Sequence, residues 1–309
     1  MITYHKTIEN KLVKIETLTE DTWVNVINPT QDEIEIIQSW GVQKEFITDP
    51  LDINERSRTE RDMDFTFILS RIPFDQGEKE DIPYITIPFG IILLKDYIIT
   101  ICSRENTLIN RILTKKSKNY STVKRNRFIL QTMLANASLF LDYLREINSK
   151  VEIAEDELQR SVHNRELMEL LKFQKSLVYF STALKTNELI FERLSRQKFF
   201  VVFPDDADLL EDVIIENLQA IEMTNIASNL LVQMMDAFAS IIQNNQNIIF
   251  KIMTALTIIL SLPTIISSFF GMNVGLPLQN SPYSFVSIAL FSLGVMLLLA
   301  MFFKRIDWL

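Results

Sequence analysis

The chain has 309 residues, a formal net charge of −8 and one cysteine, and 48% of its residues are apolar. A single cysteine excludes an intrachain disulfide. With only His5 and His163 beside Cys102, the sequence also argues against a zinc site of the usual Cys/His type. Residues 1–247 hold 28 of the 31 basic and 38 of the 39 acidic residues, a net charge of −10, which argues against a nucleic-acid partner and attracts cations.

Residues 1–120 alternate short apolar runs with turn signals, the pattern of a domain that contains both strands and helices. The runs that predict strands are 65–72, 84–88, 89–94 and 97–102, the last two forming a hairpin around residues 95–96. Helical patterns cover 31–40 and 107–116. We therefore expect an α/β cytoplasmic domain with a small sheet.

Long helices follow from residue 121 onward. Within 121–203, helical patterns over 124–157 and 166–194 lack Gly and Pro and predict an antiparallel pair. Pro204 and the two aspartates after it signal a helix start, because carboxylates are favourable at the positive end of the helix dipole. Since neither Pro nor Gly follows until Pro263, we expect one very long helix, with a stalk over 204–247.

Two membrane spans are predicted near the end of the chain, at 248–270 and 285–303, each close to the roughly 20 residues that a crossing helix needs. Lys251 is the only charged residue between 248 and 303. The N-terminus lacks a signal-peptide core, and the basic tail 304–309 contrasts with the uncharged loop 271–284. The positive-inside rule therefore predicts a multi-pass protein of the cell membrane with both termini in the cytoplasm.

A mostly polar stripe runs along the first span in alternating steps of three and four residues, which places its members on one helix face. It consists of Asn247, Phe250, Thr254, Thr257, Ser261, Thr264 and Ser268. The same steps continue backwards through mostly polar stalk positions to residue 208. Helix packing is the alternative explanation, since Ser and Thr are common at contacts between membrane helices. A pore lining explains the length of the stripe better, and because one face cannot enclose a pore it requires a cyclic oligomer.

Apolar positions beside the stripe are expected to pack against adjacent helices. They are Val213, Ala220, Ala227, Leu230, Met234 and Ile241.

The sequence Gly271-Met272-Asn273 follows the first span directly. This motif, placed between two C-terminal spans and after a long stalk, resembles the signature of the CorA family of magnesium/cobalt transporters. The resemblance implies a funnel-shaped homopentamer in which the first span lines the pore and Gly271, Met272 and Asn273 form the selectivity filter. It implies passive transport of divalent cations, Mg²⁺ in the first place and Co²⁺ or Ni²⁺ beside it, without a nucleotide.

The resemblance also implies regulation, with closure of the pore when intracellular Mg²⁺ binds stalk carboxylates between subunits. The positions that match are Asp212 and Asp236, and we add Asp208, which lies one turn before Asp212. Asp75 and Asp81 are candidates for the partner carboxylate. Helix capping is the alternative role for Asp212.

Two departures from the family pattern concern the outer mouth. Phe270 stands where the family often has a tyrosine, and residues 276–279 are uncharged where an acidic residue is common. Zinc-transporting relatives share the motif, so transport of Zn²⁺ is an alternative. A membrane-anchored sensor or scaffold is a second one, but an anchor has no reason to keep a polar face. An enzyme is not supported, because the chain has no GxxxxGK[ST] or GxGxxG motif to hold phosphates.

Overall fold

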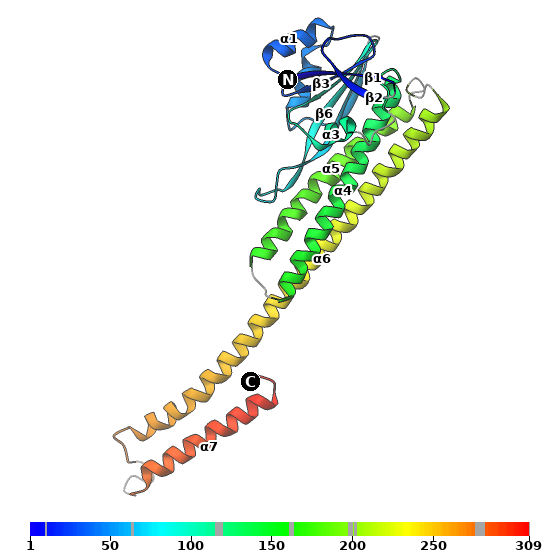
Figure 1. The fold of residues 1–309 in the computed structure, drawn as a ribbon. Helices are drawn as coiled ribbons and strands as arrows, with labels where there is room; N and C mark the ends of the chain where they lie inside the picture. The colour runs from blue at the N-terminus through cyan, green and yellow to red at the C-terminus, as the bar shows by residue number, and fades with distance from the viewer. Residues whose placement is uncertain are drawn as a thin grey trace. The chain divides into compact units, whose positions relative to one another are not determined.

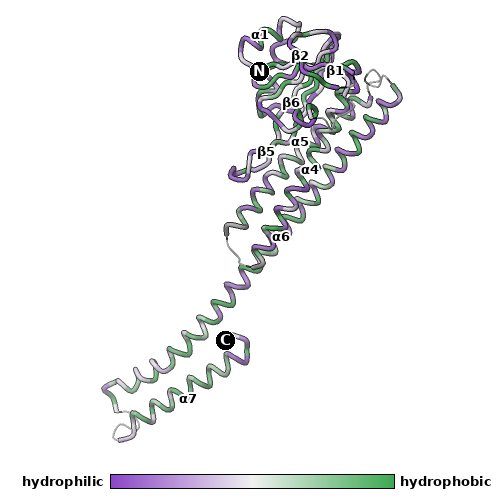
Figure 2. Tube along the Cα trace, in the orientation of Figure 1, coloured by the Kyte–Doolittle hydropathy of each residue, from purple (hydrophilic) through white to green (hydrophobic). Residues whose placement is uncertain are grey.

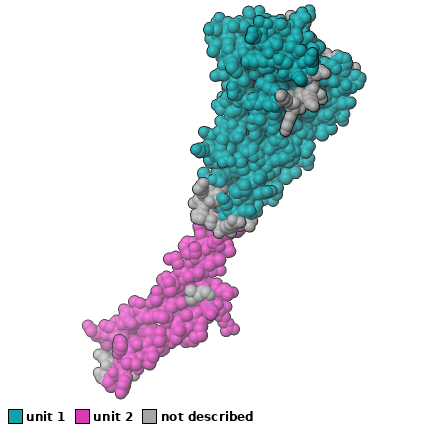
Figure 3. Space-filling model, viewed as in Figure 1, with its two compact units in different colours: residues 1–234 teal, residues 235–309 magenta. Residues whose placement is uncertain are grey.

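A computed structural model describes residues 1–9, 11–62, 65–114, 120–160, 164–196, 200, 203–275 and 282–308. The chain divides into two compact units, residues 1–234 and residues 235–309 (Figure 3). One helix, α6 (Pro204–Phe270), contributes residues to both units.

The first unit is built on a seven-stranded sheet with the strand order β2-β1-β3-β7-β6-β5-β4 (Figure 1). All neighbouring strands are antiparallel except β3 and β7, which are parallel. The strands are β1 (Ile2–Ile8), β2 (Lys11–Ile15), β3 (Thr22–Ile27), β4 (Arg58–Arg61), β5 (Phe65–Asp75), β6 (Tyr84–Leu94) and β7 (Tyr97–Cys102).

The prediction of strands was confirmed for β5, β6 and β7 and missed the other four. The runs 84–88 and 89–94 form a single strand, β6, which passes through Pro88. Opposite Pro88 stands Arg71, whose backbone N–H and C=O are bonded to the side-chain amide of Asn187 instead (2.9 and 2.8 Å). The proline is tolerated because the ladder does not need its missing N–H.

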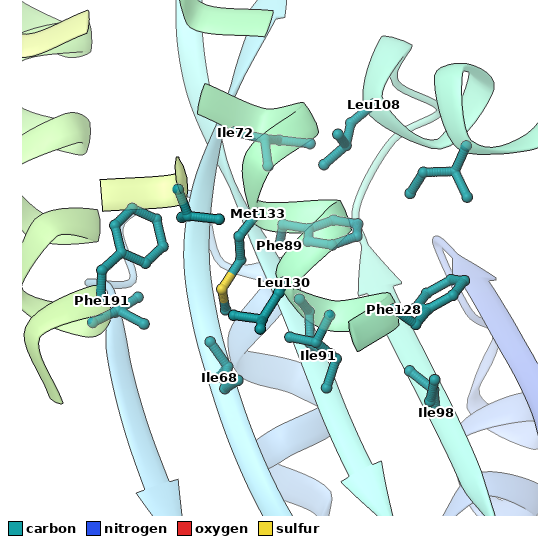
Figure 4. Packing of buried hydrophobic residues seen from close by; sticks show 14 of the residues in the cluster. Ile68, Ile72, Phe89, Ile91, Ile98, Leu108, Phe128, Leu130, Met133 and Phe191 are labelled. Carbon is teal, nitrogen blue, oxygen red and sulfur yellow. The ribbon is translucent and has the colours of Figure 1, made fainter. Parts of the chain in front are cut away.

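Alternating residues of the strands enter two separate cores, one on each face of the sheet. In β5, Phe67 and Leu69 belong to the core beneath the short helices α1 (Gln31–Ser39), α2 (Lys44–Thr48) and η1 (Asp49–Leu51). Ile68 and Ile72 belong to the other core, beneath the long helices. Figure 4 shows this second core, where Phe89 of β6 lies close to Leu130 and Met133.

The first core requires close contact between η1 and the sheet. A Cβ atom placed on Gly90 would lie 2.4 Å from Cγ of Pro50, well inside van der Waals distance. Glycine at this point of β6 therefore lets η1 pack directly onto the strand. At the edge of the same layer, Thr30 and Glu33 form a capping box that fixes the start of α1.

Four helices cover the second core: α3 (Thr107–Leu113), α4 (Arg125–Arg160), α5 (Asn164–Arg196) and the first part of α6. The predicted pair of long helices is confirmed, and α4 and α5 lie side by side and antiparallel (Figure 1). The start of α6 packs on this pair. Ser138 of α4 donates to Glu216, and Asn217 donates to the Leu184 carbonyl of α5.

This packing shows which helices the apolar stalk positions contact. Val213, Ala220 and Ala227 are buried inside the chain's own helix layer, so they are not free to pack a neighbouring copy. Leu230 and Ile241 remain exposed, at 58% and 46%. The expected packing against adjacent helices is therefore met within the chain for three of the six apolar positions.

The second unit consists of the rest of α6 and of α7 (Ser284–Arg305). Both α6 and α7 are long and apolar enough to cross a membrane. Figure 2 shows that α7 and the last part of α6 are largely hydrophobic, whereas residues 243–247 of α6 are polar. They contact each other through a small cluster of Ala255, Ile259 and Phe303.

Candidate pore-lining face and outer motif

The polar stripe of the first span is exposed in the single chain. All seven members, from Asn247 to Ser268, have solvent-accessible side chains, and Phe250 reaches 65%. In contrast, Ala255 and Ile259 of the same helix segment are buried against α7. The stripe is therefore not used to pack the two spans of one chain together.

The two faces point in nearly opposite directions. At about 100° of rotation per residue, Ala255 and Ile259 lie on average roughly 150° around the helix axis from the mean direction of the stripe. Since α7 covers the far side, the polar face stays open to a partner or to water. The alternative of a polar packing surface between the two spans of one chain is thus excluded by the position of α7.

Three of the five hydroxyl groups in the stripe share a hydrogen-bond geometry. Each donates its hydrogen to a backbone carbonyl one turn earlier in α6, which leaves the lone pairs of the oxygen free to act as acceptors. The bonds are Thr257 to Met253 at 2.8 Å, Ser261 to Ile258 at 3.0 Å and Thr264 to Leu260 at 3.1 Å. A face of acceptors suits the water shell of a cation, whose hydrogens point away from the ion.

The outer motif begins where α6 ends. The N–H of Gly271 donates to the carbonyls of Ser267 and Ser268 (3.0 and 3.2 Å), and Met272 N–H donates to Phe269 (3.3 Å). Asn273 follows with an exposed side chain. Residues 276–281 of the predicted outer loop lie outside the described residues.

The conformation of this chain does not demand glycine at position 271. Its φ is not in the left-handed region, and an added Cβ would meet only the carbonyl oxygens of Ser267 and Ser268 at 3.4 and 3.5 Å, an ordinary contact. A backbone conformation that only glycine adopts is therefore not the reason for Gly271.

The three stalk carboxylates proposed for regulation are all exposed. Asp208 and Asp212 stand one turn apart on the side of α6 away from Val213, and Asp236 lies further along the helix. Within the described residues, no group of three or more His, Cys, Asp or Glu side chains is placed to hold a metal ion. Of the candidate partners, Asp81 accepts a 2.8 Å bond from Lys175.

One buried ion pair at the base of the stalk was not predicted. Asp206 is 1% exposed and accepts from Nε of Arg127 at 2.7 Å, while Asp205 lies 3.3 Å from the same guanidinium. These carboxylates raise the pKa of Arg127 above its usual value. The sequence indicated only a helix start here, because nothing local links positions 127 and 206.

The sequence and the fold were compared with those of known proteins. Residues 20–305 match the family described as "CorA-like Mg2+ transporter protein". The cobalt/magnesium transport protein CorA of Methanocaldococcus jannaschii is 28% identical over 294 residues, covering 93% of this chain and 91% of that protein. CorA of Thermotoga maritima is 20% identical, covering 93% and 83%. In fold, the complete structure of the M. jannaschii CorA magnesium transporter matches with a TM-score of 0.86 at 23% identity, covering 100% of this chain and 99% of that one. The chain therefore belongs to the CorA family, whose members are ion transporters and not enzymes.

Proposed function

We propose that this chain is one subunit of a homopentameric channel through which divalent cations, Mg²⁺ in the first place, enter the cell passively. The observation that carries the proposal is the exposed polar stripe of α6, which faces away from α7. A face of hydroxyl and amide groups is costly against lipid, and association of several copies around an axis turns it toward water.

The ion is expected to pass with its water shell largely intact. Mg²⁺ dehydrates reluctantly and is usually held partly through its waters. The acceptor oxygens of Thr257, Ser261 and Thr264 suit hydrogen bonds from those waters, since their own hydrogens are engaged in the helix. At the mouth, the exposed amides of Asn273 from all copies form a ring that selects the hydrated ion.

The electrochemical gradient supplies the driving force. A divalent ion gains about 4.6 kcal/mol per 100 mV of inside-negative potential, so no nucleotide is needed. We place both termini in the cytoplasm, which puts Asn273 on the outer side. Closure then follows when intracellular Mg²⁺ binds Asp212 and Asp208 together with carboxylates of a neighbouring subunit, and Asp236 contributes further along the stalk.

Uptake by purified full-length protein in liposomes tests this function. We expect saturable Mg²⁺ uptake without nucleotide that increases when an inside-negative potential is imposed with valinomycin, and native mass spectrometry should report five copies. The same assay with Co²⁺, Ni²⁺ and Zn²⁺ separates a magnesium channel from a zinc-transporting relative. A stable monomer or dimer, or uptake no greater than that of empty liposomes, would contradict the proposal.

A further inference from the structure

Three basic residues and one tryptophan lie at the end of the helix pair where α7 ends. We call them the cation cluster: Lys251, Lys304, Arg305 and Trp308. The three basic side chains are exposed, and within the described part of the chain none is paired with a carboxylate.

The end of α7 has a geometry that fixes Trp308. Asp307 adopts the left-handed conformation (φ 55°), and the N–H groups of Asp307 and Trp308 donate back to the carbonyls of Lys304 and Phe303 at 3.4 and 3.0 Å. These two bonds form a Schellman motif. The indole of Trp308 stacks on Phe303, with ring centroids 5.6 Å apart and planes 24° from parallel. The side chains of Lys304 and Arg305 remain exposed.

The third cation comes from the other span. Lys251 precedes Ala255 by one turn on the same side of α6, and Ala255 shares a buried cluster with Phe303 and its neighbour Trp308. All three charges are therefore held at the same end of the helix pair. Lys304 and Arg305 are favourable at the C-terminal end of α7 because cations stabilise the negative end of the helix dipole. This reason does not apply to Lys251, which lies in the interior of α6.

We propose that the cation cluster binds the phosphate group of anionic phospholipids in the membrane leaflet at that end of the spans. Basic side chains at this depth attract anionic lipids, and tryptophan favours the same interfacial region. The surface beside the cluster is apolar and open, with Met301 60% and Phe302 56% exposed, so it suits acyl chains as well as a headgroup. The inference rests on the membrane insertion contained in the proposed function.

Lipid binding to the full-length protein tests this inference. Native mass spectrometry would compare phosphatidylglycerol with phosphatidylcholine on the wild type, on the triple variant Lys251→Gln, Lys304→Gln, Arg305→Gln, and on a control of equal charge change. That control combines Lys11→Gln, Lys44→Gln and Lys185→Gln, three exposed positions of the first unit. We expect the triple variant to bind phosphatidylglycerol about a hundredfold more weakly and the control to keep wild-type binding.

A charge-conserving variant separates binding from misfolding. Lys251→Arg with Lys304→Arg should keep the preference for phosphatidylglycerol. Equal binding of the two lipids by the wild type, or wild-type preference in the triple variant, would overturn the proposal. Binding of soluble glycerol 3-phosphate as strong as that of phosphatidylglycerol would also overturn it, because the site would then bind a free phosphate compound.

The readout of this test is independent of conduction. Loss of the lipid preference is measured on protein whose Mg²⁺ uptake is followed separately in liposomes. A wild type that transports Mg²⁺ but shows no lipid preference contradicts the lipid site alone. A wild type that prefers phosphatidylglycerol but carries no ion supports the lipid site and contradicts the channel.

Discussion

Removal of one hydroxyl ring from the polar stripe should slow Mg²⁺ flux by a calculable amount. Thr257→Val keeps the shape of the side chain and leaves the backbone hydrogen bonds of α6 in place. It removes the hydroxyl group, which donates its hydrogen to the Met253 carbonyl (2.8 Å) and offers its oxygen lone pairs as outward acceptors. Each lost hydrogen bond to a water of the ion is worth about 1 kcal/mol. A hydrated ion that touches two such hydroxyls at once would lose about 2 kcal/mol, or roughly thirtyfold in rate.

Adjacent serines near the outer end of α6 provide a matched control for this reasoning. Ser267 and Ser268 are both exposed, but they lie about 100° apart around the axis, and only Ser268 belongs to the stripe. Ser268→Ala should reduce Mg²⁺ uptake in liposomes, whereas Ser267→Ala should leave it near the wild-type rate. Equal rates in Thr257→Val, Ser268→Ala and Ser267→Ala would refute the assignment of the stripe to the pore.

Three further outcomes are expected. Asp212→Ala should weaken inhibition by Mg²⁺ on the cytoplasmic side in patch recordings, while the exposed neighbour change Glu211→Gln should not; unchanged inhibition would assign Asp212 to helix capping. Burial and the Lys14 cation lower the pKa of His5 from 6.5 to about 4, so the folded state binds fewer protons between these values. The melting temperature in detergent should therefore fall as the pH drops through this window, and His5→Gln should remove that dependence. Asn187→Leu should destabilise the fold by about 2 kcal/mol at the first-unit transition, because it leaves the backbone N–H of Arg71 unpaired, while Asn136 still donates to the Arg71 carbonyl; an unshifted melting temperature would show that water replaces the amide.

The membrane part and the long helices were predictable because their signals are local. Uncharged runs of membrane length and the steps of three and four along α6 can be read directly from the chain. The direction of the stripe relative to α7 could not be derived, since it depends on which residues of α6 contact Phe303.

Three of the four strands that escaped prediction lie at or next to an edge of the sheet, whereas the fourth, β3, is buried in its interior. β1 and β2 lie at one edge of the sheet and carry many polar residues, as in Lys11–Ile15, so they lack a clear apolar pattern. β4 is four residues long and forms the opposite edge of the sheet. Its short length leaves the backbone N–H and C=O of Arg71 without a partner on the β4 side, and the amide of Asn187, far away in sequence, takes that place. Tertiary compensation of this kind leaves no trace in local sequence.

The carboxylates proposed for regulation could not be brought together from the sequence. Asp212 and Asp236 match positions of the family, Asp208 lies one turn before Asp212, and in one chain all three are exposed. A site between copies draws its ligands from two subunits, so neither the local sequence nor a single subunit assembles it. The Mg²⁺ inhibition assay on Asp212→Ala is for this reason more informative than any contact within the chain.

Flux through Asn273 variants is the most direct test of conduction along α6 and past the outer motif. Potential-driven Mg²⁺ uptake would be measured in liposomes with wild type, Asn273→Ala and Asn273→Asp, each verified to assemble like the wild type. We expect Asn273→Ala to lose selective uptake, since an acceptor disappears from every copy at about 1 kcal/mol each. We expect Asn273→Asp to bind Mg²⁺ more tightly and to release it more slowly. An Asn273→Ala protein that carries Mg²⁺ at the wild-type rate and selectivity would contradict conduction past Asn273.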